Sequence, residues 1–139
     1  MQPGKIRVVI VDDHPLVRQT WKMILESTDR IDVVRECNDG GDAIDCALEL
    51  MPDVILMDIN MSPINGFEAT RKILKQSPHL KIIGISVNNQ PSYAKNIMQL
   101  GAKGYVTKNS TKEEMVQAIN EVAQGKTYIC DEVLVKMKN

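Results

Sequence analysis

Short apolar runs alternate five times with longer segments in which apolar residues recur at helical spacing. A nearly unbroken apolar run is typical of a parallel strand with both faces buried. Apolar residues at every third or fourth position indicate an amphipathic helix that covers such a strand. The pattern therefore predicts strands at residues 5–11, 31–37, 54–57, 81–86 and 104–106.

Start and stop signals divide the segments between these strands into helices. Proline is favoured at the first helical position, and Ser, Thr or Asp side chains cap helix N-termini. A helix is expected after each strand, the third of them over residues 67–76. The expected boundaries are a start at Pro15 after His14, a cap at Asp42, stops at Pro52-Asp53, Ser77-Pro78 and Gly101, and a last helix from Ser110 or Thr111 to near Gly125.

This alternation of strand and helix predicts an α/β fold, a (βα)5 doubly wound parallel sheet with helices on both faces. The common five-stranded solution has the flavodoxin-like strand order 2-1-3-4-5. A chain of 139 residues is long enough for one domain, which we expect over residues 1–125. Residues 126–139 are expected to form a C-terminal tail, either a short helix or the start of a linker.

Charge and cysteine content narrow the function classes. Lys and Arg number 17 and Asp and Glu 18, so the net charge is −1 and this segment has no basic field to grip nucleic acid by itself. The three cysteines lack zinc-binding spacing and are expected to be buried or idle thiols. No apolar run reaches the roughly 18–20 residues of a membrane span, and no signal peptide opens the chain. We therefore expect a cytoplasmic protein without membrane contact.

Polar side chains stand where the predicted strands end. Asp12 and Asp13 follow the first strand, Asp58 follows the third, Ser86 ends the fourth and Lys108 follows the fifth. The strand order places the ends of the first and third strands side by side, at the edge of the sheet where such folds bind ligands. The three carboxylates are therefore expected to converge. Taken alone, each residue has a simpler explanation as a cap, a turn former or a surface charge, but chance is a poor account of all of them together.

A cluster of three carboxylates has a specific chemical requirement. Two like charges about 4 Å apart repel by roughly 4 kcal/mol at an effective dielectric near 20. The cluster stays ionised only with a bound cation, for which oxygen ligands favour Mg²⁺, or else one carboxylate is protonated with a raised pKa. With the cation present, Asp58 can accept a phosphoryl group as an acyl phosphate, while Lys108 neutralises charge and Ser86 donates a hydrogen bond.

These motifs together resemble the receiver domain of bacterial two-component response regulators, over residues 6–125. The residues that match are Val8-Val9-Ile10-Val11-Asp12-Asp13-His14, Pro52-Asp53-Val54-Ile55-Leu56-Met57-Asp58, Gly66, Ile85-Ser86 and Gly101-Ala102-Lys103-Gly104-Tyr105-Val106-Thr107-Lys108. Two further stretches resemble the NarL/FixJ-like branch, in which a LuxR-type DNA-binding domain usually follows the receiver. They are His14-Pro15-Leu16-Val17-Arg18 and Gly125-Lys126-Thr127-Tyr128-Ile129.

The resemblance implies a role for each carboxylate. Asp58 would be phosphorylated from the phosphohistidine of a sensor histidine kinase, in a Mg²⁺-dependent transfer. Asp13 and Asp58 would bind the metal directly, Asp12 through water and Asn60 through its backbone carbonyl. The chain would not be an enzyme in its own right, because it promotes only its own phosphorylation and dephosphorylation.

The resemblance also implies how the signal is passed on. Ser86 and Lys108 would bind the phosphoryl oxygens, and Tyr105 would turn inward as Ser86 moves toward them. The first helix, from Pro15, would help to dock the kinase, and the signal would leave through the face formed by the fourth strand, the fourth helix and the fifth strand. The output would be transcriptional, through a DNA-binding domain absent from this chain, with residues 126–139 as the start of its linker. Phosphorylation would favour a homodimer.

Two positions depart from the family pattern. Val87 stands where the family usually has Ala or Gly, and the hypothesis is that it narrows access to the phosphoryl site and slows exchange with small phosphodonors. In the stretch Met61-Ser62-Pro63 the proline is displaced by one residue, which leaves the shape of that loop open.

Three other functions share part of this pattern. A binding module with the receiver fold that signals without phosphorylation is the main alternative. A haloacid-dehalogenase-like phosphatase needs a second acid two residues after the nucleophile, where this chain has Asn60. A flavodoxin-like flavin carrier needs a phosphate-binding loop after the first strand, where this chain has acids that repel phosphate.

Overall fold

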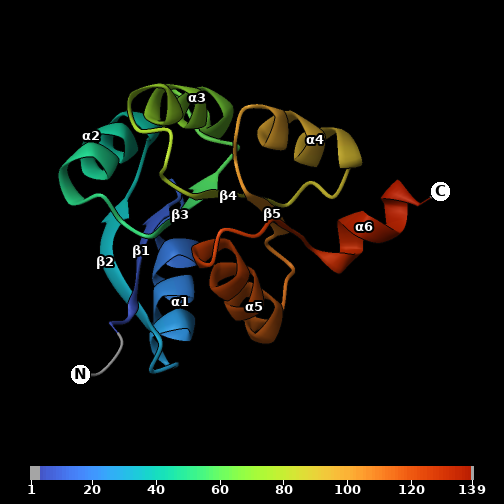
Figure 1. Cartoon of the computed structure of the whole chain (residues 1–139), viewed down its shortest axis with the longest axis horizontal. Coiled ribbons are helices and arrows are strands. Elements are labelled where there is room, and N and C mark those ends of the chain that lie inside the picture. Colours follow the sequence, from blue (N-terminus) through green and yellow to red (C-terminus); the bar gives the residue numbers. More distant parts are fainter. Residues whose placement is uncertain (1–3, 139) are drawn as a thin grey trace.

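The protein has one six-stranded parallel sheet at its centre (Figure 1). A computed structural model describes residues 4–138. The strand order is β2-β1-β3-β4-β5-β6, so the predicted order of the first five strands is confirmed. The strands are β1 (Ile6–Val11), β2 (Ile31–Cys37), β3 (Val54–Asp58), β4 (Ile82–Ser86), β5 (Gly104–Thr107) and β6 (Tyr128–Ile129).

Helices cover both faces of the sheet, as the doubly wound pattern predicts. Helices α1 and α5 lie on one face, and α2, α3 and α4 lie in a row on the other (Figure 1). Among the described residues, no helix is long and apolar enough to cross a membrane. The helices are α1 (Pro15–Glu26), α2 (Gly40–Leu50), α3 (Gly66–Gln76), α4 (Pro91–Gln99), α5 (Lys112–Ala123) and α6 (Asp131–Met137).

The cap of α2 differs from the prediction. The helix begins at Gly40, and its N-cap is Asp39, whose side chain accepts a hydrogen bond of 2.7 Å from the backbone N–H of Asp42. Asp42 therefore lies in the first turn. Glycine is a weak helix former, which made this stretch resemble a turn. Glycine is present at position 40 because of packing, since a Cβ there would lie 2.8 Å from the side chain of Ile64.

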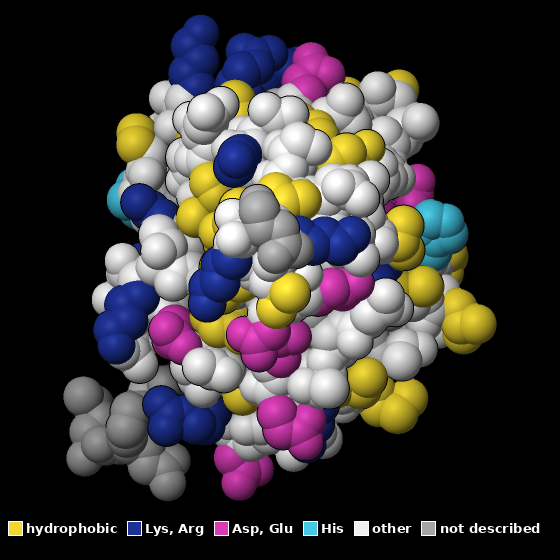
Figure 2. Space-filling model, turned by 90° about the vertical axis from the view of Figure 1, so that its right-hand side faces the viewer, with side chains coloured by type: hydrophobic (Ala, Val, Ile, Leu, Met, Phe, Trp, Pro, Cys, Tyr) yellow, Lys and Arg dark blue, Asp and Glu magenta, His cyan; other side chains and the backbone are white. Residues whose placement is uncertain are grey.

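The chain after Gly125 adds one more strand and one more helix to the domain. Strand β6 pairs in parallel with β5, with Tyr128 opposite Gly104. Helix α6 follows and lies beside α4 (Figure 1), on the face of the molecule that Figure 2 shows. Cys130, the N-cap of α6, and Val133 within the helix are fully buried. This segment is therefore packed onto the core that the five predicted strands form.

The core is aliphatic, as a chain with few aromatic residues requires. All residues of β3 and β4 are buried, including the polar Asp58 and Ser86 at their carboxyl ends. Cys37, Cys46 and Cys130 are free and buried. Apolar strands with polar last residues deliver functional groups to one edge of the sheet while the rest of the strand stabilises the fold.

Truncating Val133 measures how much α6 contributes to this core. We expect Val133→Ala to lower the free energy of unfolding by about 2 kcal/mol, since it removes buried methyl groups and leaves a cavity. Val135→Ala is the matched control in the same helix, because Val135 is 63% exposed. It should change stability by less than about 0.5 kcal/mol. Urea unfolding of the three proteins makes the comparison, and equal stabilities would mean that α6 is not part of the folded unit.

Candidate functional site

The carboxyl ends of β1, β3 and β5 bring three charged groups together. The Lys108 ammonium lies 2.9 Å from Asp12 Oδ2 and 3.4 Å from Asp58 Oδ2. Asp58 is completely buried, and Asp12 is only 3% exposed. Two buried carboxylates therefore share one ammonium group at the edge where β1 and β3 are neighbours.

The loop after β3 fixes the backbone of Asp58. The N–H of Ile59 donates to the carbonyl of Ile85, and the N–H of Gly66 closes the loop by donating to Ile59 O at 2.9 Å. A Cβ at Gly66 would lie 2.6 Å from Ile59 Cα and would collide with the Asp58 carbonyl. Glycine is therefore required there, because the backbone of α3 approaches the strand end so closely. Within this loop Met61 is buried and the Ser62–Pro63 bond is cis.

The charge balance of the site is negative. Burial raises the pKa of Asp58, and the neighbouring Asp12 raises it further, while Lys108 and the Asn60 N–H act in the opposite direction. Burial works to lower the pKa of Lys108, but its contacts with Asp12 and Asp58 outweigh burial and leave that pKa raised. Lys108 is therefore held as a cation, yet one ammonium does not offset both carboxylates.

Asp13 and His14 complete an acidic cluster. Asp13 Oδ1 is buried and has no hydrogen-bond partner among the described residues, although it lies 3.0 Å from His14 Nδ1. The ligand atoms of Asp12, Asp13, His14 and Asp58 all lie within 4.8 Å of one another. His14 was not among the predicted site residues, although its place directly after the acid pair was a signal for it. Its side chain is 63% exposed.

This cluster suits a hard divalent cation. Such ions prefer carboxylate and carbonyl oxygens and usually keep several waters. Asp13 Oδ1 is a buried acceptor without a hydrogen-bond partner among the described residues, and a counter-ion would offset the negative charge of Asp12 and Asp58. The residues present therefore fit the metal that the sequence predicts.

Ser86 lies beside Asp58 but is bonded elsewhere. Its hydroxyl donates to Asn60 Oδ1 at 2.6 Å and accepts from the Asn88 N–H at 3.0 Å. The Asn60 N–H in turn donates to Asp58 Oδ1 at 3.0 Å. The sequence drew attention only to the Asn60 carbonyl, so this contact of its side chain was missed. Ser86 and Asp58 are thus linked through Asn60.

Tyr105 lies inside the protein in this structure. It is fully buried, and its hydroxyl donates to the backbone carbonyl of Asn88. Burial raises the pKa of Tyr105 to about 12. The loop between β4 and α4 is therefore bonded to the two residues that the sequence assigns to the switch, to Ser86 through the Asn88 N–H and to Tyr105 through the Asn88 carbonyl. A movement of Tyr105 stays a prediction.

Val87 borders an apolar groove next to the acidic cluster. The side chain is 70% exposed. The groove, of about 550 Å³, runs from α1 to the start of α5 and includes Lys108. Val87 therefore stands at the rim of the site. The lining residues are Leu16, Val17, Thr20, Trp21, Ile24, Val87, Lys108, Ser110 and Lys112.

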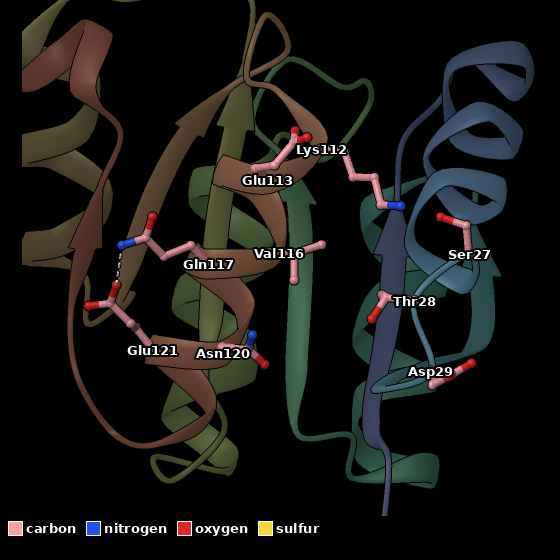
Figure 3. A pocket seen from close by; sticks show the side chains of 9 residues that line it. All are labelled: Ser27, Thr28, Asp29, Lys112, Glu113, Val116, Gln117, Asn120 and Glu121. Carbon is pink, nitrogen blue, oxygen red and sulfur yellow. Dashed lines mark hydrogen bonds between the residues drawn. The ribbon is translucent and has the colours of Figure 1, made fainter.

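A second groove, of about 650 Å³, continues along α1 and α5 (Figure 3). Ser27, Thr28 and Asp29 after α1 face Lys112 and Asn120 of α5 across it. Lys112 lines both grooves. The surface between α1 and α5 is thus hollowed along its length, with an apolar end at the acidic cluster and a polar end away from it.

Comparison with known proteins identifies the class that this fold and site define. The sequence pattern of the response regulator receiver domain matches residues 8–120, most of the chain. The chain belongs to the response regulator receiver domain family.

Particular relatives place it within that family. It is 42% identical to the response regulator GacA of Pseudomonas aeruginosa over 128 residues, which are 92% of this chain and 60% of GacA. It is 40% identical to the transcriptional regulatory protein DegU of Brevibacillus brevis over 126 residues, 91% of this chain and 53% of DegU. The chain thus spans between half and two thirds of the length of these relatives.

A solved structure extends the likeness to three dimensions. The two-component response regulator of the LuxR family from Aurantimonas sp. SI85-9A1 has a TM-score of 0.93 and is 31% identical. The match covers 97% of this chain and 96% of that one, so it includes β6 and α6. These likenesses confirm the predicted NarL/FixJ-like branch.

The raised pKa of Asp58 predicts how stability depends on pH. In the folded protein the pKa of Asp58 is raised above its ordinary value of 3.8, so folding favours the protonated form. The free energy of unfolding therefore falls as the pH rises from about 3.8 through the raised pKa. Asp58→Asn avoids this loss of stability, because an asparagine amide stays neutral over the whole pH range. In metal-free buffer at pH 7 we expect the variant to be more stable than the wild type, with a difference that shrinks toward pH 4.

Urea unfolding with and without Mg²⁺ measures this effect. Mg²⁺ at 100 times its dissociation constant should add about 2.7 kcal/mol to the wild type and much less to Asp58→Asn. A wild type that is the more stable protein at pH 7 without metal would contradict the raised pKa of Asp58.

Proposed function

We propose that Asp58 is the phosphoacceptor of this receiver domain and that it takes a phosphoryl group from the phosphohistidine of a sensor histidine kinase. The observation that supports this most is the placement of a fully buried carboxylate beside the Lys108 ammonium, next to two further acids. A buried carboxylate with too few partners is unfavourable in the free protein. Metal and phosphoryl binding would give it a chemical role.

In the transfer, a carboxylate oxygen of Asp58 attacks phosphorus in line with the departing imidazole. The P–O bond forms as the P–N bond breaks, and the imidazole takes up a proton. Catalysis of this kind depends on positioning and on neutralising the equatorial oxygens. Lys108 supplies one positive charge, and Ser86 would turn from Asn60 to donate to a phosphoryl oxygen.

Mg²⁺ would be held by Asp13 and Asp58 directly, by Asp12 through water and by the backbone carbonyl of Asn60. When bound, it supplies the positive charge that Lys108 alone does not. The free acceptor Asp13 Oδ1 supports this assignment. In this proposal the phosphoryl group goes to the protein's own carboxylate and not to a separate substrate, so we infer that the protein is a signalling phosphoacceptor and not an enzyme in the ordinary sense.

The output is proposed to be transcriptional and cytoplasmic. GacA and DegU are longer than this chain, and DegU is a transcriptional regulatory protein. A LuxR-type DNA-binding domain would supply the DNA contacts, and phosphorylation would favour a homodimer.

The kinase would approach along α1, where the apolar groove with Leu16 and Val87 opens beside Lys108. A binding module that signals without phosphate is the alternative, and the complete set of acids, hydroxyl and lysine disfavours it.

Phosphorylation by a small donor tests this function. Acetyl phosphate with Mg²⁺ should add the mass of one phosphoryl group to the wild type, and none after Mg²⁺ is removed with a chelator. Asp58→Asn should stay unlabelled, since it lacks the attacking carboxylate. Asp45→Asn is the matched control, because Asp45 is an exposed acid of α2. Intact mass spectrometry reads all four samples, and an unlabelled wild type or a labelled Asp58→Asn would exclude Asp58 as the phosphoacceptor.

The hypothesis on Val87 is tested through rates. Val87→Ala should speed both labelling by acetyl phosphate and loss of the phosphoryl group by about two- to ten-fold, which corresponds to roughly 0.4–1.4 kcal/mol in the barrier. The reason is that the branched side chain stands at the rim of the site. Val135→Ala, the same change at an exposed position of α6, is the control. The hypothesis is abandoned if Val87→Ala leaves both rates unchanged.

A further inference from the structure

One carboxylate of α6 joins two segments next to the site. The side-chain amide of Asn89 donates to Glu132 Oε2 at 2.7 Å, and the Thr107 hydroxyl donates to Glu132 Oε1 at 2.7 Å. Lys136 donates to Asn89 Oδ1 at 2.7 Å. We call these three hydrogen bonds the α6 contact. It connects the C-terminal helix to the β4–α4 loop and to the end of β5.

The two anchor points lie directly beside residues of the proposed phosphorylation site. Thr107 precedes Lys108 in the chain. Asn89 follows Asn88, whose N–H donates to Ser86 Oγ and whose carbonyl accepts from Tyr105. Asn88 and Asn89 are neighbours in the chain, so a displacement of the loop at Asn88 would also shift Asn89.

The α6 contact is a packed part of the structure. Both polar atoms of the Asn89 side chain are used by α6, and Thr107 is fully buried. The hydrogen bonds from Asn89 and then Thr107 lower the pKa of Glu132, so they hold its ionised form. Beneath them Val133 is buried, and the N–H of Cys130 donates to Tyr105 O at 3.0 Å. Figure 2 shows acidic and basic side chains interspersed on this face.

Phosphorylation of Asp58 would change the hydrogen bonds of Ser86, to which the β4–α4 loop is bonded. Ser86 now donates to Asn60, and to donate to a phosphoryl oxygen on Asp58 its hydroxyl must leave Asn60. If the Ser86 side chain changes rotamer to do so, its oxygen moves away from the Asn88 N–H, and that hydrogen bond breaks unless the loop moves with it. Tyr105 is buried, and its hydroxyl donates to the Asn88 carbonyl of the same loop. The α6 contact holds this loop in its present arrangement.

We propose that Glu132 is a positioning residue through which α6 holds the β4–α4 loop in the arrangement of the unphosphorylated site, and that a phosphoryl group on Asp58 weakens the α6 contact. This inference rests on the proposed function of Asp58. Coupling between two sites is reciprocal in binding free energy. Loss of the α6 contact should therefore favour the phosphorylated arrangement to the same extent that the phosphoryl group loosens α6.

Hydrogen exchange of the wild-type protein tests one direction of this coupling. Beryllofluoride with Mg²⁺ serves as a non-reacting stand-in for the phosphoryl group. We expect backbone amides of α6 to exchange about five-fold faster or more when both are bound, which is the size of a modest coupling between sites. Amides of α2, on the far side of the molecule from α6 (Figure 1), serve as the internal reference and should not exchange faster.

Substitution in α6 tests the other direction. Glu132→Ala removes the shared acceptor, and Asp131→Ala is the matched control, because Asp131 is an exposed acid in the same first turn. We expect Glu132→Ala to bind beryllofluoride in the presence of Mg²⁺ about five-fold more tightly than Asp131→Ala. Urea unfolding of both variants verifies that the receiver core is folded, and the wild-type exchange experiment needs no variant.

The outcomes separate this inference from the proposed function. A wild type that neither binds beryllofluoride with Mg²⁺ nor accepts phosphate from acetyl phosphate overturns both. A wild type that does both, but whose α6 amides exchange at the same rate with and without beryllofluoride, overturns the role of α6 alone. Equal or weaker binding by Glu132→Ala than by Asp131→Ala does the same.

Discussion

Asp12 and Asp58 share the ammonium group of Lys108, and the rest of the site follows from this unequal balance of charge. Two buried carboxylates around one cation leave a negative charge that the low dielectric of the interior makes costly. Such an arrangement persists only because the apolar strands β1 and β3 stabilise the fold around it. A bound divalent cation would offset this charge, which is why we propose that Mg²⁺ binds before Asp58 accepts a phosphoryl group.

Much of this arrangement follows from local rules of sequence. Apolar runs with polar last residues indicated where Asp12, Asp58, Ser86 and Lys108 would lie, and one topological rule brought them to a common edge. The sixth strand escaped prediction because its two residues are too short for any periodic pattern. The start of α2 was misplaced because Gly40 is selected for contact with Ile64, which only the folded chain reveals.

The contacts that sequence reasoning missed are those between distant segments. Glu132 meets Asn89 and Thr107 across 43 and 25 positions of the chain, and Ser86 meets Asn60 across 26. No spacing rule reports such pairs, because they depend on how two loops and a helix pack. Together they connect the Asp58 carboxylate through Asn60, Ser86 and the β4–α4 loop to α6.

A crystal structure with Mg²⁺ and beryllofluoride bound tests the central claim most directly. We expect a beryllofluoride group on Asp58, bonded through beryllium to a carboxylate oxygen, with Lys108 and Ser86 in contact with its fluorine atoms and the metal in contact with Asp13 and Asp58. Ser86 should no longer donate to Asn60. A beryllofluoride group on another residue would contradict this. So would a filled site in which Ser86 still donates to Asn60 and Lys108 does not contact the fluorine atoms.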